Sequence, residues 1–243
     1  MRITWKGGVS IEYGETKVTI DPRSNNLGYP YAFVSHAHFD HSAAFRAGSA
    51  SVLSSKETGD IASIYGCKLD NWRPLTRNRG LSLGDIEIIP HDSGHVLGSF
   101  EFEVGTPKGT ALFTGDFNTR FTKTMKPAEP VPCDVLIVEA TFGSPSFSFP
   151  CEEDVAKDMI DWAKQTMKRG EIPTFQADPL GNAQEIVRIF NESTGIPVVT
   201  HGKISRINRI YESYRYKLDY TDAKTEEAEG IVSSRELIFI APK

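Results

Sequence analysis

The sequence predicts an α/β protein in two parts: a strand-rich part with sheets packed together or flanked by helices, then a smaller part with a parallel sheet. Short runs rich in β-branched and aromatic residues fill residues 1 to about 145, with few long helical patterns. Beyond them, strand and helix patterns alternate, which is typical of parallel strands joined by crossover helices. The 243 residues are 39% hydrophobic, which is enough to bury a sizeable core.

The first part is predicted to be a series of short strands separated by turn residues such as Gly7-Gly8 and Asp21-Pro22. The predicted strands are Arg2 to Trp5, Val9 to Tyr13, Lys17 to Ile20, Ala32 to Ser35, Ser51 to Ser54, Ile86 to Ile89, Ser99 to Val104, Thr110 to Thr114 and Val135 to Val138.

The second part begins after a segment rich in Ser, Pro and Phe, residues 144 to 150, so we expect domains at 1–145 and 146–243. Its first helix follows Pro150, has acidic residues in its first turn and ends before Gly170. Asp222 to Glu229 is expected to be a solvated acidic loop. The predicted order is helix Cys151 to Arg169, strand Ile172 to Gln176, helix Asn182 to Asn191, strand Ile196 to Thr200, helix Ile204 to Lys217 and strand Glu236 to Ala241.

Charge and composition exclude several classes of protein. The net charge is −5, so the chain as a whole exerts no pull on nucleic acid or on an anionic membrane. No apolar stretch approaches the ~20 residues that span a bilayer, and no apolar run follows the charged N-terminus, so we expect a cytoplasmic protein without membrane partners. Three widely spaced cysteines with no CxxC pair predict neither a disulfide framework nor a thiolate zinc site.

The chemistry is concentrated in one short segment. An apolar strand runs into His36, His38, Asp40 and His41, four side chains that can bind metal within six residues. Imidazole and carboxylate groups held in a tight loop at a strand end can surround one or two ions of the zinc type. This HxHxDH pattern resembles that of the metallo-β-lactamase superfamily, and the resemblance implies an αββα sandwich over the first domain.

The resemblance extends to residues outside this motif. Asp21 matches an Asp that ends an earlier strand in the family, His95 matches a later His ligand, and Asp116 matches a later Asp. By position, the family implies that His36, His38 and His95 hold a first ion, that Asp40 and His41 hold a second, and that Asp116 bridges them. The implied cofactor is one or two divalent ions, zinc first, with manganese or iron as alternatives. His91 has no role in the family and is interpreted as a packing or supporting residue.

Further segments resemble the nucleic-acid-processing branch of the superfamily, the β-CASP nucleases. They are Gly94 to Ser99, Thr114 to Phe117, Cys133 to Gly143 and, in the second domain, Pro173 to Phe175, Leu180 to Glu185 and Ile196 to Gly202. Within them Glu139 falls at the acidic motif of that branch, which implies an acid-base role beside Asp40 and a second domain like the β-CASP insertion.

The resemblance favours a metal-dependent hydrolase that cleaves phosphodiester bonds in RNA or single-stranded DNA. Two alternatives stay open: a catalytically deficient homologue that binds nucleic acid or a partner, and a hydrolase of small esters, thioesters or lactones. The basic and aromatic stretch from Lys203 to Lys217 fits nucleic-acid binding, but we prefer to interpret it as the exposed face of an amphipathic helix.

The family pattern also includes later residues that the chain does not match. β-CASP nucleases return after the inserted domain and supply two more functional histidines, whereas no His follows His201 here. We therefore expect the second ion to have only Asp40, His41 and Asp116 as protein ligands. A sheet left unfinished would expose an edge, so we expect a homodimer, a partner chain that completes the fold, or a longer parent sequence.

Overall fold

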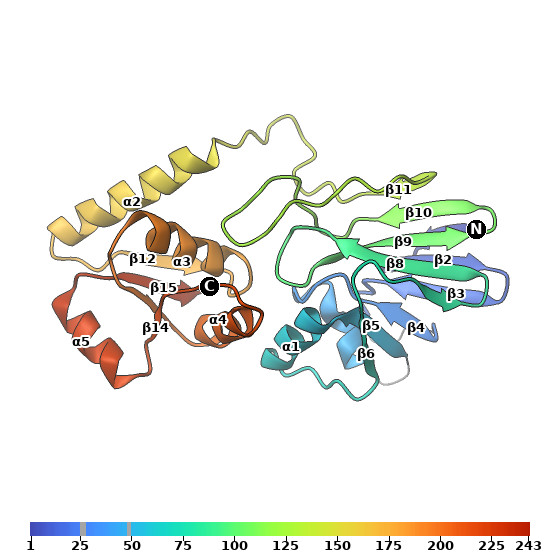
Figure 1. Cartoon of the computed structure of the whole chain (residues 1–243), viewed down its shortest axis with the longest axis horizontal. Helices are drawn as coiled ribbons and strands as arrows, with labels where there is room; N and C mark the ends of the chain where they lie inside the picture. The colour runs from blue at the N-terminus through green and yellow to red at the C-terminus, as the bar shows by residue number, and fades with distance from the viewer. Residues whose placement is uncertain (25–27, 48–49) are drawn as a thin grey trace. The chain divides into compact units, whose positions relative to one another are not determined.

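The computed structural model describes residues 1–24, 28–47 and 50–243, and the chain divides into two compact units, Met1–Glu139 and Ala140–Lys243 (Figure 1). The division lies a few residues before the boundary near residue 145 that the change in composition predicts. None of the described helices is both long enough and apolar enough to cross a membrane.

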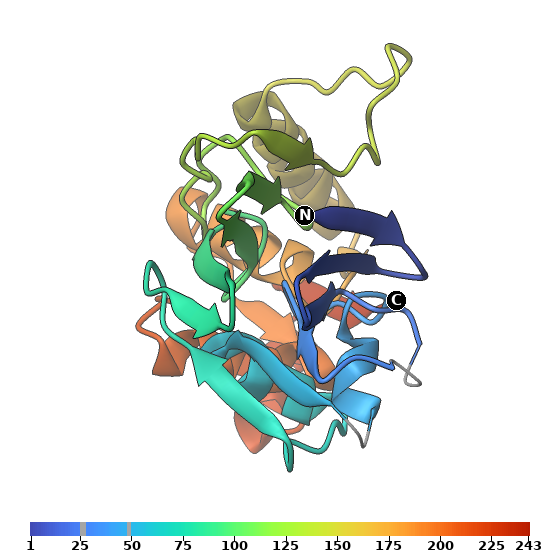
Figure 2. The same ribbon diagram turned by 90° about the vertical axis from the view of Figure 1, so that its right-hand side faces the viewer.

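The first unit contains two sheets, which lie one against the other (Figures 1 and 2). The six-stranded sheet has the order β1 (Arg2–Trp5), β2 (Val9–Tyr13), β3 (Thr16–Ile20), β4 (Tyr31–Phe33), β5 (Ser51–Ser55) and β6 (Trp72–Leu75). The five-stranded sheet has the order β11 (Val135–Ile137), β10 (Gly109–Phe113), β9 (Phe100–Thr106), β8 (Ile86–Asp92) and β7 (Leu81–Leu83).

The core between the two sheets follows from the alternation of side chains along each strand. Ile11, Ile20 and Phe33 of the first sheet pack with Phe102 and Val104 of the second in one buried cluster. Apolar residues that alternate with these on the first sheet face the other way and pack against η1 (Ser42–Arg46) and α1 (Lys56–Ile64) in a second cluster. The mixed α/β sandwich predicted for this part of the chain is confirmed.

The second unit has a four-stranded sheet in the order β12 (Thr174–Ala177), β15 (Ile238–Pro242), β13 (Val198–Thr200) and β14 (Thr221–Asp222). Every pairing within it is parallel, so the predicted parallel sheet is confirmed. The helices are α2 (Glu152–Lys168), α3 (Asn182–Ser193), α4 (Lys203–Ser213) and α5 (Glu226–Ser234). Trp162 of α2 and Phe190 of α3 both contact Phe175 of β12, which holds these helices on the sheet.

Two predictions about the second unit are wrong. The acidic segment expected to be a loop contains the first turn of α5, because Thr225 accepts a hydrogen bond from the Ala228 amide and acidic residues in a first turn complement the helix dipole. Helix α4 ends at Ser213 rather than Lys217, and Arg215 has a left-handed backbone with φ of 69°.

Helix α4 also decides between the two interpretations of its basic stretch. Ile204, Ile207 and Tyr211 are buried, so the helix is amphipathic with its arginines outside. Arg209 is paired with Asp222, which reduces the charge available to a nucleic acid. The amphipathic interpretation therefore describes α4 better.

One buried carboxyl group predicts a pH-dependent stability. Glu101 on β9 is 3% exposed, and its Oε1 accepts no hydrogen bond from the described residues. Burial, with the charge of Asp92, raises the pKa of Glu101 from 4.5 to about 7. As pH rises, Glu101 therefore loses its proton at a lower pH in the unfolded chain than in the folded one. The free energy of unfolding falls as a result between pH 4.5 and about 7.

We expect Glu101→Gln to stabilise the protein by up to about 3 kcal/mol at pH 8 and by far less near pH 4.5, because the neutral amide removes the cost of burying the charge. Urea denaturation at the two pH values measures this difference. Glu103→Gln is the matched control, since Glu103 lies on the same strand but pairs with His91 at 2.9 Å. An equal gain from Glu101→Gln at both pH values would contradict the assignment.

Candidate metal centre

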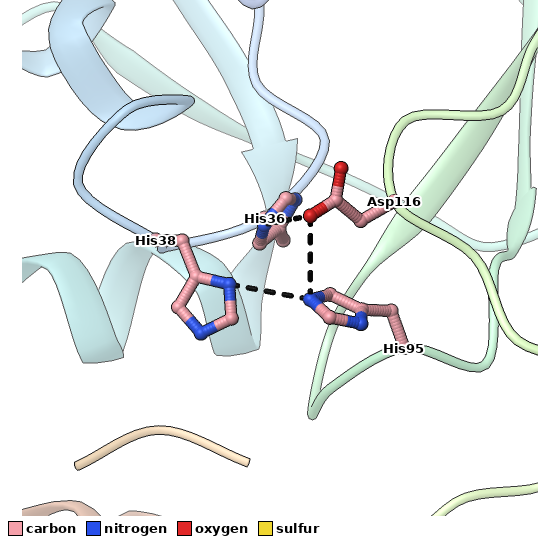
Figure 3. Close-up of side chains that lie close together, drawn as sticks. All are labelled: His36, His38, His95 and Asp116. Atoms are coloured by element: carbon pink, nitrogen blue, oxygen red, sulfur yellow. Dashed lines mark hydrogen bonds and ion pairs between the residues drawn. The ribbon is translucent and has the colours of Figure 1, made fainter. Parts of the chain in front are cut away.

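Loops that follow strands of both sheets of the first unit bring the candidate ligands together. His36, His38, Asp40 and His41 follow β4, His95 follows β8, and Asp116 follows β10. The facing side chains of His36, His38, His95 and Asp116 point toward one another (Figure 3). One ligand atom from each of these four lies within 4.8 Å of the others, although they come from three separate loops.

The distances within this cluster are short. His95 Nε2 lies 3.2 Å from His38 Nδ1 and 3.6 Å from Asp116 Oδ2 (Figure 3). His36 Nε2 lies 3.8 Å from the same carboxylate oxygen. Three imidazoles and one carboxylate form a donor set of the kind that zinc and similar ions bind.

His36 provides a test of whether the cluster fits a metal. The residue is fully buried, and its Nε2 has no hydrogen-bond partner among the described residues. A buried polar atom without a partner costs free energy, so a lone pair aimed at three other ligand atoms fits a metal ligand. Burial, together with the charges of His41, His38 and His95, holds the pKa of His36 well below its usual range, which keeps the ring neutral.

The His95 ring, like that of His36, is neutral at neutral pH. Burial and the nearby His38 and His41 lower its pKa to about 4, against the opposing effect of Glu139 and Asp40. Burial is also the main cause that raises the pKa of Asp116. At neutral pH the His95 ring therefore keeps a lone pair that can bind a cation.

Asp21 accepts hydrogen bonds that orient residues of the ligand cluster. It is buried, directly follows β3, and accepts hydrogen bonds from the Ser35 amide at 2.7 Å and the Ser35 hydroxyl at 2.5 Å. With its hydroxyl proton on Asp21, Ser35 Oγ accepts from His36 Nδ1 at 2.9 Å, which leaves His36 Nε2 without a proton. His41 Nδ1 also donates to Asp21, at 2.7 Å.

His41 is turned toward both remaining carboxylates. Its Nε2 lies 3.4 Å from Asp40 Oδ2 and 3.5 Å from Asp116 Oδ1. Burial lowers the pKa of His41, but the hydrogen bond to Asp21 and the charges of Asp21, Asp116 and Asp40 outweigh it and raise the pKa to about 9. Ligand atoms of Asp21, His36 and His41 also lie within 4.8 Å of one another, yet Asp21 already accepts three hydrogen bonds and so orients its neighbours.

The two predicted acid-base residues, Asp40 and Glu139, differ in their exposure to solvent. Asp40 is on the open side of the cluster with its side chain 65% exposed. Glu139 is half-buried, its amide donates to Thr114 Oγ1 at 3.3 Å, and its charge raises the pKa of both His95 and Asp116. Both carboxylates are thus close to the ligand cluster.

His91 lies apart from the cluster. Its ring nitrogens contact Asn78 Oδ1 at 3.0 Å and Glu103 Oε2 at 2.9 Å, so it links strands on the surface of the second sheet. Ser35 is the residue that the sequence interpretation missed. The available signal was its position directly before His36 at the end of a buried strand.

Two glycines allow the loops to approach one another. Gly94 has φ of 70°, and a Cβ there would lie 2.6 Å from the Lys126 carbonyl oxygen. Gly115, with φ of 54°, would place a Cβ 2.9 Å from the Ser35 side chain. Glycine is needed at both positions because other residues rarely adopt this backbone and would also clash.

Comparison with known proteins adds a resemblance over most of the chain. No family model matches the sequence. The chain is 29% identical over 187 residues to a probable DNA ligase from Opitutus terrae, covering 75% of this chain and 18% of that protein. It is 27% identical over 253 residues to RNase aCSPSF2 from Saccharolobus solfataricus, covering 89% of this chain and 50% of that protein. The chain thus spans half or less of the length of these two relatives.

A solved structure shows the same fold. It is that of a protein of unknown function from Enterococcus faecalis V583, with a TM-score of 0.64, 15% identity, and coverage of 97% of this chain and 73% of that one. At this identity the likeness concerns the fold alone. The relatives in sequence confirm the predicted resemblance to metallo-β-lactamase and β-CASP nucleases.

Proposed function

We propose that this chain carries the metal centre of a hydrolase that cleaves phosphodiester bonds in RNA or single-stranded DNA. The observation that carries the proposal is the cluster of His36, His38, His95 and Asp116, in which the buried Nε2 of His36 has no hydrogen-bond partner among the described residues and lies 3.8 Å from the Asp116 carboxylate. The similarity to an RNase over 89% of the chain supports a nucleic-acid substrate.

Each residue of the cluster has a proposed part. His36, His38, His95 and Asp116 would hold a first divalent ion, and Asp40 and His41 would hold a second together with Asp116. Bound ions of the zinc type lower the pKa of a coordinated water to near 7 and neutralise charge on a phosphate. Zinc suits this mixture of imidazole and carboxylate ligands.

The chain's own carboxylates would move the protons. Glu139 borders both His95 and Asp116, where it can take a proton from an attacking water and return it to the leaving oxygen. Asp40 is open to solvent and can carry outward the second proton, which the phosphate product releases. Ser35, itself held by Asp21, keeps His36 in the tautomer that leaves Nε2 free for the ion. Asp21 fixes the orientation of the His41 ring, whose Nε2 proton a bound cation would displace.

A small ester, thioester or lactone is the second candidate substrate. The net charge of −5 and the pairing of Arg209 with Asp222 favour it, because both weaken the attraction of a polyanion. The ligand cluster is equally compatible with either substrate class, so only an assay separates them.

The test begins with the metal content per chain of protein purified without chelator or tag-derived metal. We expect at least one equivalent of a divalent ion, cleavage of single-stranded RNA or DNA, and loss of both after treatment with a chelator. Cleavage of a nitrophenyl ester without cleavage of either nucleic acid would favour the second candidate. A folded protein that binds no metal would contradict both and leave a binding role.

A further inference from the structure

An exposed aromatic residue, Phe39, separates two of the candidate ligands in the sequence. Phe39 follows His38 and precedes Asp40, and it is 77% exposed. The amides of His41 and Ser42 both donate to the His38 carbonyl at 3.1 Å, which closes a tight turn with Phe39 at its corner. Single exposed apolar residues are common on protein surfaces, so the significance of Phe39 is its place beside the metal centre.

Neighbouring residues hold Phe39 in place. The Arg46 guanidinium lies over its ring, 4.7 Å from the centroid, and the Ser42 hydroxyl donates to the Phe39 carbonyl at 3.3 Å. Ser42 and Arg46 belong to η1, whose Ala43, Ala44 and Phe45 are buried and anchor it. Because Arg46 occupies one face of the ring, the high exposure of Phe39 means that solvent reaches the other face.

Phe39 has a cationic neighbour in Arg46 although the whole chain is acidic. Arg46 also lines a cavity of about 270 Å³, whose other charged residues are Lys68 and Asp70 and whose aromatic residues are Phe45 and Trp72. An aromatic ring beside cationic groups is the arrangement that proteins use to bind unpaired bases and their phosphates.

We propose that Phe39 stacks on an unpaired base next to the phosphate that is cleaved, with Arg46 bracing the ring and contacting the backbone of the same strand. This inference rests on the proposed function and specifies its substrate as single-stranded. A base within a duplex is covered on both faces by its neighbours, whereas an unpaired base can offer one face to Phe39.

Binding of a 12-nucleotide single-stranded RNA carrying a fluorescein label, measured by anisotropy in EDTA so that no strand is cut, tests the inference. Stacking on one aromatic side chain leads us to expect roughly tenfold weaker binding for Phe39→Leu and near wild-type binding for Phe39→Tyr. The penalty of Phe39→Leu should vanish on a strand whose bases have been replaced by abasic sites.

Trp5→Leu is the matched control. Trp5 is also an exposed aromatic, at 63%, with the Arg23 guanidinium 5.6 Å from its ring centroid, but it lies on β1 and not in the turn that carries the ligands. We expect this variant to bind the RNA as the wild type does. Phe39→Leu should also keep the metal content of the wild type.

The outcomes separate this inference from the proposed function. If the wild type cleaves or binds the RNA but Phe39→Leu binds it equally well, the role of Phe39 is overturned and the nuclease proposal stands. The role is also overturned if Phe39→Leu weakens binding of the abasic strand as much as that of the normal one, or loses metal. If the wild type neither binds nor cleaves the RNA, both proposals fail together.

Discussion

Replacing His95 with alanine is expected to remove both hydrolysis and bound metal, whereas the same replacement at His91 leaves both nearly unchanged. The two histidines lie four positions apart, yet only His95 has its ring against His38 and Asp116. Loss of a residue that merely supports a ligand costs roughly 10- to 100-fold in metal affinity or activity, so loss of a ligand should exceed that.

The measurement is elemental analysis of each variant together with its cleavage rate at saturating substrate. His91→Ala controls for the loss of an imidazole and for the general effect of substitution on this sheet, because His91 only links Asn78 and Glu103. A His95→Ala protein that keeps its metal and its rate would place the reaction elsewhere in the molecule. A His91→Ala protein that loses both would mean that the β8–β9 contact shapes the centre.

The strands of the first unit could be predicted because they are short runs rich in β-branched and aromatic residues that turn residues separate. Ile11, Ile20 and Phe102 show this pattern and all lie in the inter-sheet core. Helix α1 was missed because it is short and its signal is a single N-cap, in which Ser55 Oγ accepts from the Thr58 amide. Short strands such as β7 and β14 were also missed because their few residues show no period.

The candidate site could be predicted as far as the residue types that metals require. The spacing of His36, His38 and His41 indicates a shared loop, and their proximity to His95 follows from the family resemblance. The supporting hydrogen bonds could not be predicted, because Asp21 follows β3, Ser35 follows β4, and the two residues meet only when these strands pair in parallel. Serine and aspartate are also common in the turns that follow strands, so their residue types alone do not indicate this supporting role.

Asp21→Asn is expected to weaken metal binding and hydrolysis by roughly 10- to 100-fold without unfolding the chain. Asp21 has φ of 45°, a left-handed backbone that Asn tolerates better than Ala, so the substitution preserves the loop. It removes the charge that accepts from Ser35 and from His41 Nδ1. The amide nitrogen cannot accept from these donors, so the His36 ring loses its fixed tautomer and the His41 ring loses its fixed orientation.

The measurement combines a titration with zinc against a competing chelator and a urea denaturation curve. Asp134→Asn is the matched control, because Asp134 also accepts from a backbone amide, that of Thr110 at 2.8 Å, but lies outside the ligand cluster. If both variants lose equal stability and neither loses zinc affinity, Asp21 is only a structural carboxylate. A loss of affinity confined to Asp21→Asn would mean that one buried carboxylate sets the protonation of two ligands, because Asp21 is the only described acceptor that both the Ser35–His36 chain and His41 share.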